Sequence, residues 1–388
     1  MKGKKLHICL NMIADPNWHA GNIYIQNIIH AIQNLTPKER ADIHLSITTR
    51  RNNSDLNTIL PHIDQVFIDT IFHLGFYKIL QILPAFLRFP LFNFRKIDFY
   101  YPAGNLPKKW LFKWGGWIPD FQYRYLPQLF SDDEYRNREN RNSHLAKESP
   151  VLAFSSQCAM DDYIKFFPKY KGNEFLLRFV SNANENWLRE NPVQYQLKFQ
   201  LPDQFFIVCN QFWKHKDHGT IIDAIHILKQ KGIIIHVVCT GSTEDFRNPE
   251  YFPDLLKKAE ELEVKDQFIV LGFISRNEQI QLIRRSLAII QPSLFEGWST
   301  VVEDGRSLGK SIFLSDFSVH VEQNPPFTWY FEQRNAIQLA TLIEEHNKEL
   351  TPGPDLQKEK QAFKLNHEMM ADFGRRFIEM ARKANAVT

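Results

Sequence analysis

Short apolar runs alternate with segments of helical periodicity between positions 205 and 314, and this alternation restricts the fold more than any other feature. The apolar runs cover 205–209, 233–240, 267–270, 287–290 and 311–314, and the helix-period segments cover 218–231, 251–262, 277–285 and 300–309. Continuous apolar strands separated by helices are typical of a parallel sheet covered on both faces. The pattern predicts a doubly wound α/β domain, in which ligands bind beyond the carboxyl ends of the strands.

The segment 291–323, QPSLFEGWSTVVEDGRSLGKSIFLSDFSVHVEQ, follows one of these strands and places carboxylates around the start of a helix. Thr300, with Glu303 three residues later, has the pattern of a capping box, in which the two side chains satisfy each other's backbone amides. The other amides of the first turn remain available to an anion, and the helix dipole stabilises negative charge there by roughly 0.3–1 kcal/mol. The segment therefore predicts a diphosphate pocket, although a capped helix without any ligand would have the same pattern.

The same segment resembles the retaining, nucleotide-sugar-dependent glycosyltransferases of the GT-B fold, a large family (glycosyltransferase family 4-like) with members in bacterial polysaccharide and O-antigen synthesis. The family signature is a Glu, seven residues, and a second Glu; here it is Glu296, the seven residues from Gly297 to Glu303, and Asp304. By this resemblance Glu296 contacts the donor sugar and Asp304 binds the ribose hydroxyls. Because Asp is one methylene shorter than Glu, ribose binding could be shifted or shared with Glu303.

A second resemblance lies at 210–217, NQFWKHKD, directly after the strand at 205–209. In the family an Arg stands at this strand end and a Lys follows five residues later, and both neutralise the diphosphate as it leaves. Lys216 falls on the Lys position, and Gln211 stands where the Arg usually is. An ammonium beside a developing phosphate charge supplies the electrostatic stabilisation that sugar transfer needs. A solvated loop lysine is the alternative reading of Lys216.

The resemblance and the strand ends imply further residues of the donor site. They are Gly241 at a strand end, Ile274 in a turn that would meet the nucleobase, and Gly297, Ser299, Thr300 and Val301 around the diphosphate. An ordinary connecting turn is the alternative for Ile274.

The first half of the chain predicts a second Rossmann-like domain, so that the expected architecture is a GT-B fold with two such domains facing a central cleft. A strand at 6–10 and a loop at 15–22 lead into a helix at 23–35. In GT-B enzymes this loop is usually rich in glycine, which lets the backbone approach the donor phosphate. Only Gly21 remains here, and a simple helix entry is its alternative reading.

The stretch 116–130, GWIPDFQYRYLPQLF, resembles one that is common in bacterial cell-surface polysaccharide transferases. By this resemblance Asp120 lies at the end of a strand, near the acceptor or the sugar, and a turn-forming residue is its alternative role. Relatives often carry His where this chain has Tyr123 or Pro119, so no general base is identified.

The family mechanism needs neither a protein nucleophile nor a metal. Retention is explained by attack on the face that the leaving group departs from, with the departing phosphate helping to deprotonate the acceptor. The chain contains no Asp-x-Asp pattern, with which the other large transferase fold holds a metal-bound diphosphate. We therefore expect a metal-independent enzyme without a cofactor, whose donor substrate is a nucleotide-diphosphate sugar.

The length of 388 residues suits two domains. We expect an acceptor-binding domain at 1–185, completed by a C-terminal helix at 367–388, and a donor-binding domain at 186–366, joined by a polar linker at 181–191. The net charge of +3 without a basic run gives no support to nucleic-acid binding. Four scattered cysteines, Cys9, Cys158, Cys209 and Cys239, indicate reduced thiols in a cytoplasmic protein.

The stretch 71–99 is crowded with Phe, Leu and Ile and contains four basic residues, Lys78, Arg88, Arg95 and Lys96. Such a surface could lie at the inner face of a membrane, next to a lipid-linked glycan acceptor. A buried helix and loop of the acceptor domain explain it equally well. The apolar run near the start is too short for a signal peptide, and no segment predicts a membrane span.

Two other functions are compatible with the sequence. Gln211, Asp304, Tyr123 and the reduced glycine loop would also fit a non-catalytic member that binds a glycan or a partner protein. A nucleotide-sugar epimerase on the same scaffold would turn over its substrate without an acceptor.

Overall fold

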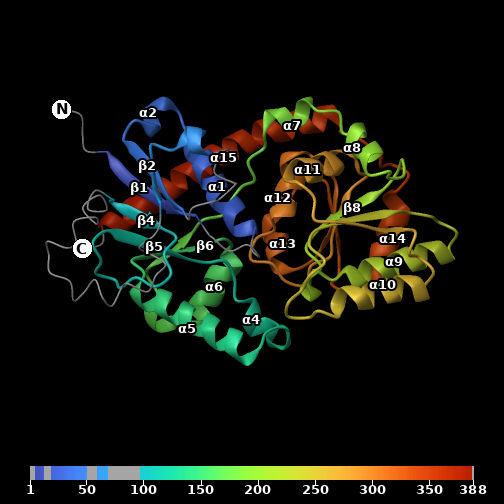
Figure 1. Ribbon diagram of the computed structural model, residues 1–388, viewed down its shortest axis with the longest axis horizontal. Helices are drawn as coiled ribbons and strands as arrows, with labels where there is room; N and C mark the ends of the chain where they lie inside the picture. Colours follow the sequence, from blue (N-terminus) through green and yellow to red (C-terminus); the bar gives the residue numbers. More distant parts are fainter. Residues whose placement is uncertain (1–4, 13–18, 50–58, 69–96, 387–388) are drawn as a thin grey trace. The chain divides into compact units, whose positions relative to one another are not determined.

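The computed structural model describes residues 5–12, 19–49, 59–68 and 97–386. The chain forms two compact units (Figure 1). Unit 1 comprises Met1–Phe121, Arg136–Val180 and Glu368–Thr388, and unit 2 comprises Gln122–Tyr135 and Ser181–His367. The short segment Gln122–Tyr135 thus belongs to unit 2 although unit 1 surrounds it in sequence, an exchange that the sequence pattern did not indicate.

In the described residues of unit 1, a seven-stranded parallel sheet has the order β3-β2-β1-β4-β5-β6-β7. The strands are β1 Leu6–Asn11, β2 Ile43–Thr49, β3 Gln65–Ile68, β4 Phe99–Tyr101, β5 Lys113–Ile118, β6 Val151–Phe154 and β7 Glu174–Leu176. The helices are α1 His19–Gln33, α2 Pro37–Arg40, α5 Asp132–Glu148, which begins in unit 2, and α6 Gln157–Phe166, with 3-10 turns at Leu60–His62 and Pro168–Tyr170.

The last helix, α15 at Leu356–Ala386, starts in unit 2 and ends in unit 1. Its second part packs closely on α1, because a Cβ on Gly374 would lie only 2.5 Å from the Ala31 carbonyl oxygen. Phe373 and Phe377 of the same part are buried. The helix begins earlier than the predicted position 367.

The described part of unit 2 contains a six-stranded parallel sheet with the order β10-β9-β8-β11-β12-β13. The strands are β8 Phe206–Cys209, β9 Val237–Thr240, β10 Phe268–Gly272, β11 Ile289–Gln291, β12 Ile312–Ser315 and β13 Thr328–Phe331. The helices are α4 Gln122–Tyr125, α7 Glu185–Arg189, α8 Val193–Lys198, α9 His218–Gln230, α10 Tyr251–Glu261, α11 Arg276–Arg285, α12 Thr300–Ser307, α13 Ser318–Gln323 and α14 Ala336–His346, with 3-10 turns at Pro127–Leu129 and Lys214–Lys216.

Helices cover both faces of the unit 2 sheet. Phe206 and Val208 point into a cluster formed with α9, α10 and α14, whereas Phe205 and Ile207 belong to a second cluster with α11 and α12. The helices α14 and α10 both contact α9 (Figure 1). The predicted strands and helices between 205 and 314 are confirmed, although the strand expected at 233–240 is shorter. The doubly wound fold class is therefore confirmed for this unit.

The stretch 181–191, predicted as a polar linker, follows the division between the two units at Val180 and Ser181. It contains the short helix α7, and Trp187 and Leu188 pack against the second cluster. The guanidinium of Arg284 explains the order, because it donates hydrogen bonds to the backbone carbonyls of Trp187, Leu188 and Glu190 and also pairs with buried Glu359 at 2.6 Å. A charge buried with all of its donors occupied holds this segment in place.

Two predicted features lie largely outside the described residues: positions 15–18 of the first loop, and 71–96 of the aromatic, basic stretch. Within the ranges that the structure describes, no helix combines the length and hydropathy that a membrane span requires.

We expect Gly374→Ala to destabilise unit 1, although alanine favours a helix over glycine by about 0.5–1 kcal/mol. The added methyl group would overlap the Ala31 carbonyl and force α15 away from α1, at a cost of about 1–3 kcal/mol. Thermal unfolding should show a Tm lowered by several degrees. Gly104→Ala is the control, because nothing lies within 4 Å of a Cβ at that position. Equal Tm values for the two variants would contradict the described packing.

Candidate functional site

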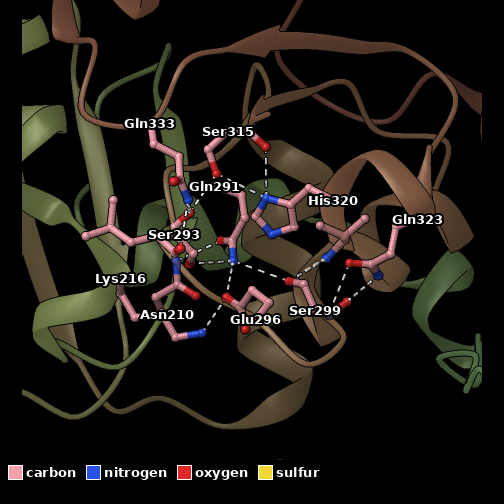
Figure 2. A network of polar contacts seen from close by, with 12 residues as sticks. Asn210, Lys216, Gln291, Ser293, Glu296, Ser299, Ser315, His320, Gln323 and Gln333 are labelled. Carbon is pink, nitrogen blue, oxygen red and sulfur yellow. Dashed lines mark hydrogen bonds and ion pairs between the residues drawn. The ribbon is translucent and has the colours of Figure 1, made fainter. Parts of the chain in front are cut away.

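A polar network lies at the carboxyl edge of the unit 2 sheet, where β8 and β11 are neighbours (Figure 2). The strand order reverses between these two strands, since β9 follows β8 on one side and β12 follows β11 on the other. Asn210, directly after β8, donates a hydrogen bond from Nδ2 to Oε1 of Gln291, the last residue of β11, at 2.7 Å. Such a switch point is where ligands bind in doubly wound sheets.

The buried carboxamide of Gln291 is the centre of this network. Its Nε2 lies 3.1 Å from Ser293 Oγ, 3.0 Å from Glu296 Oε1 and 3.3 Å from Ser299 Oγ. One side chain thus fixes the loop that carries Glu296 and the start of α12. The sequence analysis missed Gln291, for which the available signal is a polar residue at the end of an apolar strand.

Lys216 and Glu296 form an ion pair within the network, as Figure 2 shows. Lys216 Nζ lies 2.5 Å from Glu296 Oε1, and the side chains are 15% and 10% exposed. Lys216 ends a 3-10 turn, and Asp217 with φ 53° then starts α9. Burial raises the pKa of Glu296. The Lys216 ammonium, His320 and a hydrogen bond from Ser293 lower it by more than burial raises it, so the pKa lies below its ordinary value. The structure brings these two predicted residues together as an ionised pair.

The capping box predicted for Thr300 and Glu303 is wrong. Ser299 is the N-cap of α12, and its hydroxyl accepts from the Val302 amide at 3.5 Å. Gln323 from α13 also clamps the backbone of Ser299, accepting from its N–H at 3.1 Å and donating to its C=O at 3.1 Å. The Ser299 amide is therefore already paired. Thr300 and Val301 occupy the first two helical positions, where amides have no acceptor within their own helix.

Glu303 is buried and does not face the start of its helix. Its carboxylate accepts from Gln323 Nε2 at 3.0 Å and pairs with Arg306 at 3.3 Å. Burial raises the pKa of Glu303, against the Arg306 guanidinium and the Gln323 amide, which lower it.

Asp304, the second acidic residue of the signature, is fully buried and paired. Arg276 donates to both of its carboxylate oxygens at 2.6 and 2.5 Å, and the Ser181 hydroxyl donates to Oδ1 at 2.6 Å. The side chain of Arg276 is 31% exposed, and its guanidinium carbon lies 5.6 Å from the centre of the Trp187 ring. Arg276, rather than Asp304, is the exposed member of this pair, and the sequence analysis did not single it out.

His320 and Ser315 complete the network and were also missed, although both lie in the segment 291–323. His320 Nδ1 lies 3.0 Å from the Ser315 carbonyl oxygen and 3.1 Å from Ser315 Oγ, which itself donates to the Ser293 carbonyl at 2.8 Å. The imidazole is completely buried.

Gly241 has a steric reason to be glycine. It adopts φ +134°, and a Cβ there would lie 2.2 Å from the Asn210 carbonyl oxygen. Its amide donates to the Gly272 carbonyl at 2.8 Å, which joins the ends of β9 and β10. The other predicted donor-site positions, Gln211, Ile274 and Gly297, are half-buried on the loops that follow β8, β10 and β11.

The two predicted residues of the first half lie in unit 1. Asp120 is half-buried just after β5, as the prediction of a strand end requires, and Gly21 is buried in the first turn of α1. Their roles stay predictions. No group of three or more His, Cys, Asp or Glu side chains in the described ranges is arranged to hold a metal ion, and metal independence likewise stays a prediction.

We expect Lys216→Met to raise the pKa of Glu296 above the ordinary 4.5, because burial would then act without the ammonium that opposes it. In the native protein the lowered pKa stabilises the fold above pH 4.5, and this contribution is lost as the pH falls through the folded value. In the variant the sign reverses, so ionisation of Glu296 destabilises the fold. The Tm difference between the two proteins should therefore widen from about pH 4 to about pH 8.

Lys231→Met is the matched control for this prediction. Lys231 pairs with Glu344 on an exposed surface, where loss of the pair changes stability little. A Tm difference for Lys216→Met that does not vary with pH would contradict the assigned electrostatics.

Comparisons with known proteins concern the family of unit 2 and the fold of the chain. Residues 193–350, all within unit 2, match the family model described as Glycosyl transferases group 1. No curated protein sequence matches the chain.

Solved structures resemble the chain over almost its full length. A glycosyltransferase from Rickettsia africae ESF-5 is 12% identical, with 99% of this chain and 100% of the other covered and a TM-score of 0.67. Anabaena Alr3699/HepE in complex with UDP and glucose is 14% identical, with 96% and 98% covered and a TM-score of 0.65. The sucrose-phosphate synthase of Thermosynechococcus elongatus is 14% identical, with 99% and 100% covered and a TM-score of 0.67.

At these identities the structural likeness shows the fold, which is GT-B. The match to the group 1 glycosyltransferase model is confined to residues 193–350, within unit 2.

Proposed function

We propose that the chain is a retaining glycosyltransferase that moves a sugar from a nucleotide-diphosphate sugar to a glycan or lipid-linked acceptor in cell-surface polysaccharide synthesis. The observation that carries the proposal is the Lys216–Glu296 pair at the switch point of the unit 2 sheet, next to the first amides of α12. The pair supports the proposal, because a cation and helix amides would suit a diphosphate and a carboxylate would suit a sugar hydroxyl.

The diphosphate would take Lys216 from Glu296. A diphosphate carries more negative charge than one carboxylate, so it competes effectively for the ammonium. The amides of Thr300 and Val301 and the dipole of α12 add donors for the same group. As the bond to the sugar breaks, charge develops on the departing phosphate, and these fixed donors stabilise it.

Release from Lys216 frees Glu296 to orient the sugar. Gln291 still donates to Glu296 Oε1 and keeps the carboxylate in position. Because the ammonium no longer opposes burial, a sugar hydroxyl donating to Glu296 is the interaction that keeps the carboxylate ionised. Glu296 thus becomes a hydrogen-bond acceptor for the donor sugar.

Binding of the ribose by Asp304 would require a rearrangement of the side chains around this residue. Asp304 has its oxygens engaged by Arg276 and Ser181, so it reaches a ribose only after one of them releases it. The partly exposed side chain of Arg276 would be a second group for a ribose or phosphate oxygen. We assign the ribose to this pair rather than to Asp304 alone.

The rest of the mechanism follows the resemblance. Attack would come from the face that the leaving group departs from, without metal or cofactor, and Asp120 would serve the acceptor side. The Anabaena structure in complex with UDP-glucose shows that a protein of this fold holds such a donor. We place the enzyme in the cytoplasm, at the inner face of the membrane, where a lipid-linked acceptor would be available.

Thermal stabilisation by UDP, GDP, ADP, CMP and dTDP, with and without EDTA, tests the donor site directly. We expect one diphosphate to raise the Tm in both conditions, because a bound ligand stabilises only the folded state. Lys216→Ala should abolish most of this shift, since it removes the cation that holds the diphosphate. Glu296→Ala should keep the shift for the diphosphate and lose sugar transfer.

Lys231→Ala, which breaks an ion pair outside the site, should behave like the native protein. A response to a nucleotide without transfer to any acceptor would favour a non-catalytic binding subunit, and turnover of the nucleotide sugar without an acceptor would favour an epimerase. Absence of a shift with every nucleotide would contradict the proposed donor site.

A further inference from the structure

The imidazole of His320 is held in one tautomer. Its Nδ1 lies 3.0 Å from the Ser315 carbonyl oxygen, which can only accept, so Nδ1 carries the proton. Burial lowers the pKa of His320 to about 4, with Glu296 acting in the opposite direction and Lys216 in the same direction. The ring is therefore neutral at physiological pH, and Nε2 is a bare hydrogen-bond acceptor.

This acceptor has no partner among the described residues. Nε2 is buried and makes no hydrogen bond in the part of the chain that the structure describes. Buried polar atoms are paired in the great majority of cases, so an unpaired one in a ligand site indicates an interaction that the ligand supplies. The ring belongs to the network of polar contacts that also contains Lys216 and Glu296, as Figure 2 shows.

His218 shows that burial alone does not make such a site. Both of its ring nitrogens also lack partners within the described ranges, but the ring stacks on Phe212 with centroids 4.2 Å apart and an interplanar angle of 13°. Its edge meets Tyr251, so that His218 acts as an aromatic member of a packed cluster. His320, in contrast, is held by hydrogen bonds at Nδ1 and belongs to the polar network that contains Lys216 and Glu296.

Neither neighbour can satisfy Nε2 in its present state. The Glu296 carboxylate only accepts, and the Lys216 ammonium donates to Glu296 and forms no hydrogen bond with Nε2. A hydroxyl of a ligand can donate the hydrogen bond that His320 Nε2 lacks, and a second hydroxyl can donate to the Glu296 carboxylate. Two adjacent acceptors, one neutral and one charged, fit neighbouring hydroxyls on a sugar ring.

We propose that His320 Nε2 accepts a hydrogen bond from a hydroxyl of the donor sugar, next to the hydroxyl that Glu296 takes, and so determines which sugar is used. This inference rests on the proposed function. The sugar would reach His320 past Lys216 and Glu296, whose side chains are partly exposed. These two side chains would separate when the diphosphate binds the ammonium. The substrate class that follows is a sugar with a free hydroxyl at the position facing His320.

The test compares nucleoside diphosphates with their sugar esters in the native protein and in His320→Asn. Asparagine can still donate to the Ser315 carbonyl, because its amide occupies about the position of Nδ1, but it has no atom at Nε2. Calorimetric titration would use UDP, GDP and dTDP, each alone and as UDP-glucose, GDP-mannose or dTDP-glucose. Affinity for the diphosphate alone should stay within about twofold, whereas the gain in affinity from the sugar should fall about three- to tenfold, as for one lost hydrogen bond.

Deoxyfluoro derivatives of the preferred sugar ester identify the hydroxyl. Fluorine cannot donate a hydrogen bond, so the derivative altered at the position facing His320 should bind the native protein more weakly by the same factor. His320→Asn should not distinguish this derivative from the parent sugar ester, because the two changes remove the same interaction. Independent effects at every position would overturn the proposal.

A measurement on the native protein covers the case in which His320→Asn does not fold. The ¹⁵N chemical shift of Nε2 should show an unprotonated nitrogen that moves on addition of the sugar ester but not of the diphosphate alone. A protonated Nε2, or no response to a bound sugar ester, would overturn the inference and leave the donor site intact. Failure of every diphosphate to bind would overturn the proposed function together with the inference.

Discussion

The arrangement at the carboxyl edge of the unit 2 sheet depends on the hydrogen bonds of one buried carboxamide, that of Gln291. Gln291 ends β11 inside a sheet covered on both faces, so its polar atoms must find partners within the protein. Its oxygen accepts from Asn210 after β8, and its nitrogen donates to the loop that follows β11. The same contacts set the spacing between these two loops. Lys216 and Glu296, which are far apart in sequence, meet because Gln291 fixes the strand ends that carry them.

Two arginine–carboxylate pairs organise what surrounds this edge. Arg284 and Arg276 both belong to α11, and they pair with Glu359 and Asp304. Burying a charge costs free energy, and removal of one partner from a buried pair is strongly destabilising, so the fully buried pair of Arg284 and Glu359 resists rearrangement. Arg284 is nearly inaccessible and holds segments of the chain together, whereas Arg276 retains partial exposure and stands where it can meet a ligand. The same chemical pair thus serves structure at one end of the helix and is available to function at the other.

The sequence predicted the features that depend on local patterns of residues. It did not predict those that depend on hydrogen-bond partners from distant parts of the sequence. Apolar runs and helical periods predicted the strands and helices of unit 2, and strand ends predicted the position of Lys216 and Glu296. The predicted capping box was wrong because Glu303 accepts a hydrogen bond from Gln323, and Ser299 rather than Thr300 is the N-cap. The order within the predicted linker was not foreseen, because it comes from hydrogen bonds that Arg284 donates from a distant part of the sequence. Gln291, His320 and Arg276 gave no periodic or motif signal, since their roles follow from pairing across the fold.

The division of the last helix between the two units has a consequence for the order of folding during synthesis. Unit 1 needs Phe373 and Phe377, and unit 2 needs Glu359 as the partner of Arg284, yet all three residues emerge from the ribosome after both sheets are complete. Domains usually fold one after the other as they are made. Here the sheet of each unit must wait, with part of its apolar surface uncovered, for the same helix. A chain cut anywhere before α15 would leave both halves incomplete rather than one half intact.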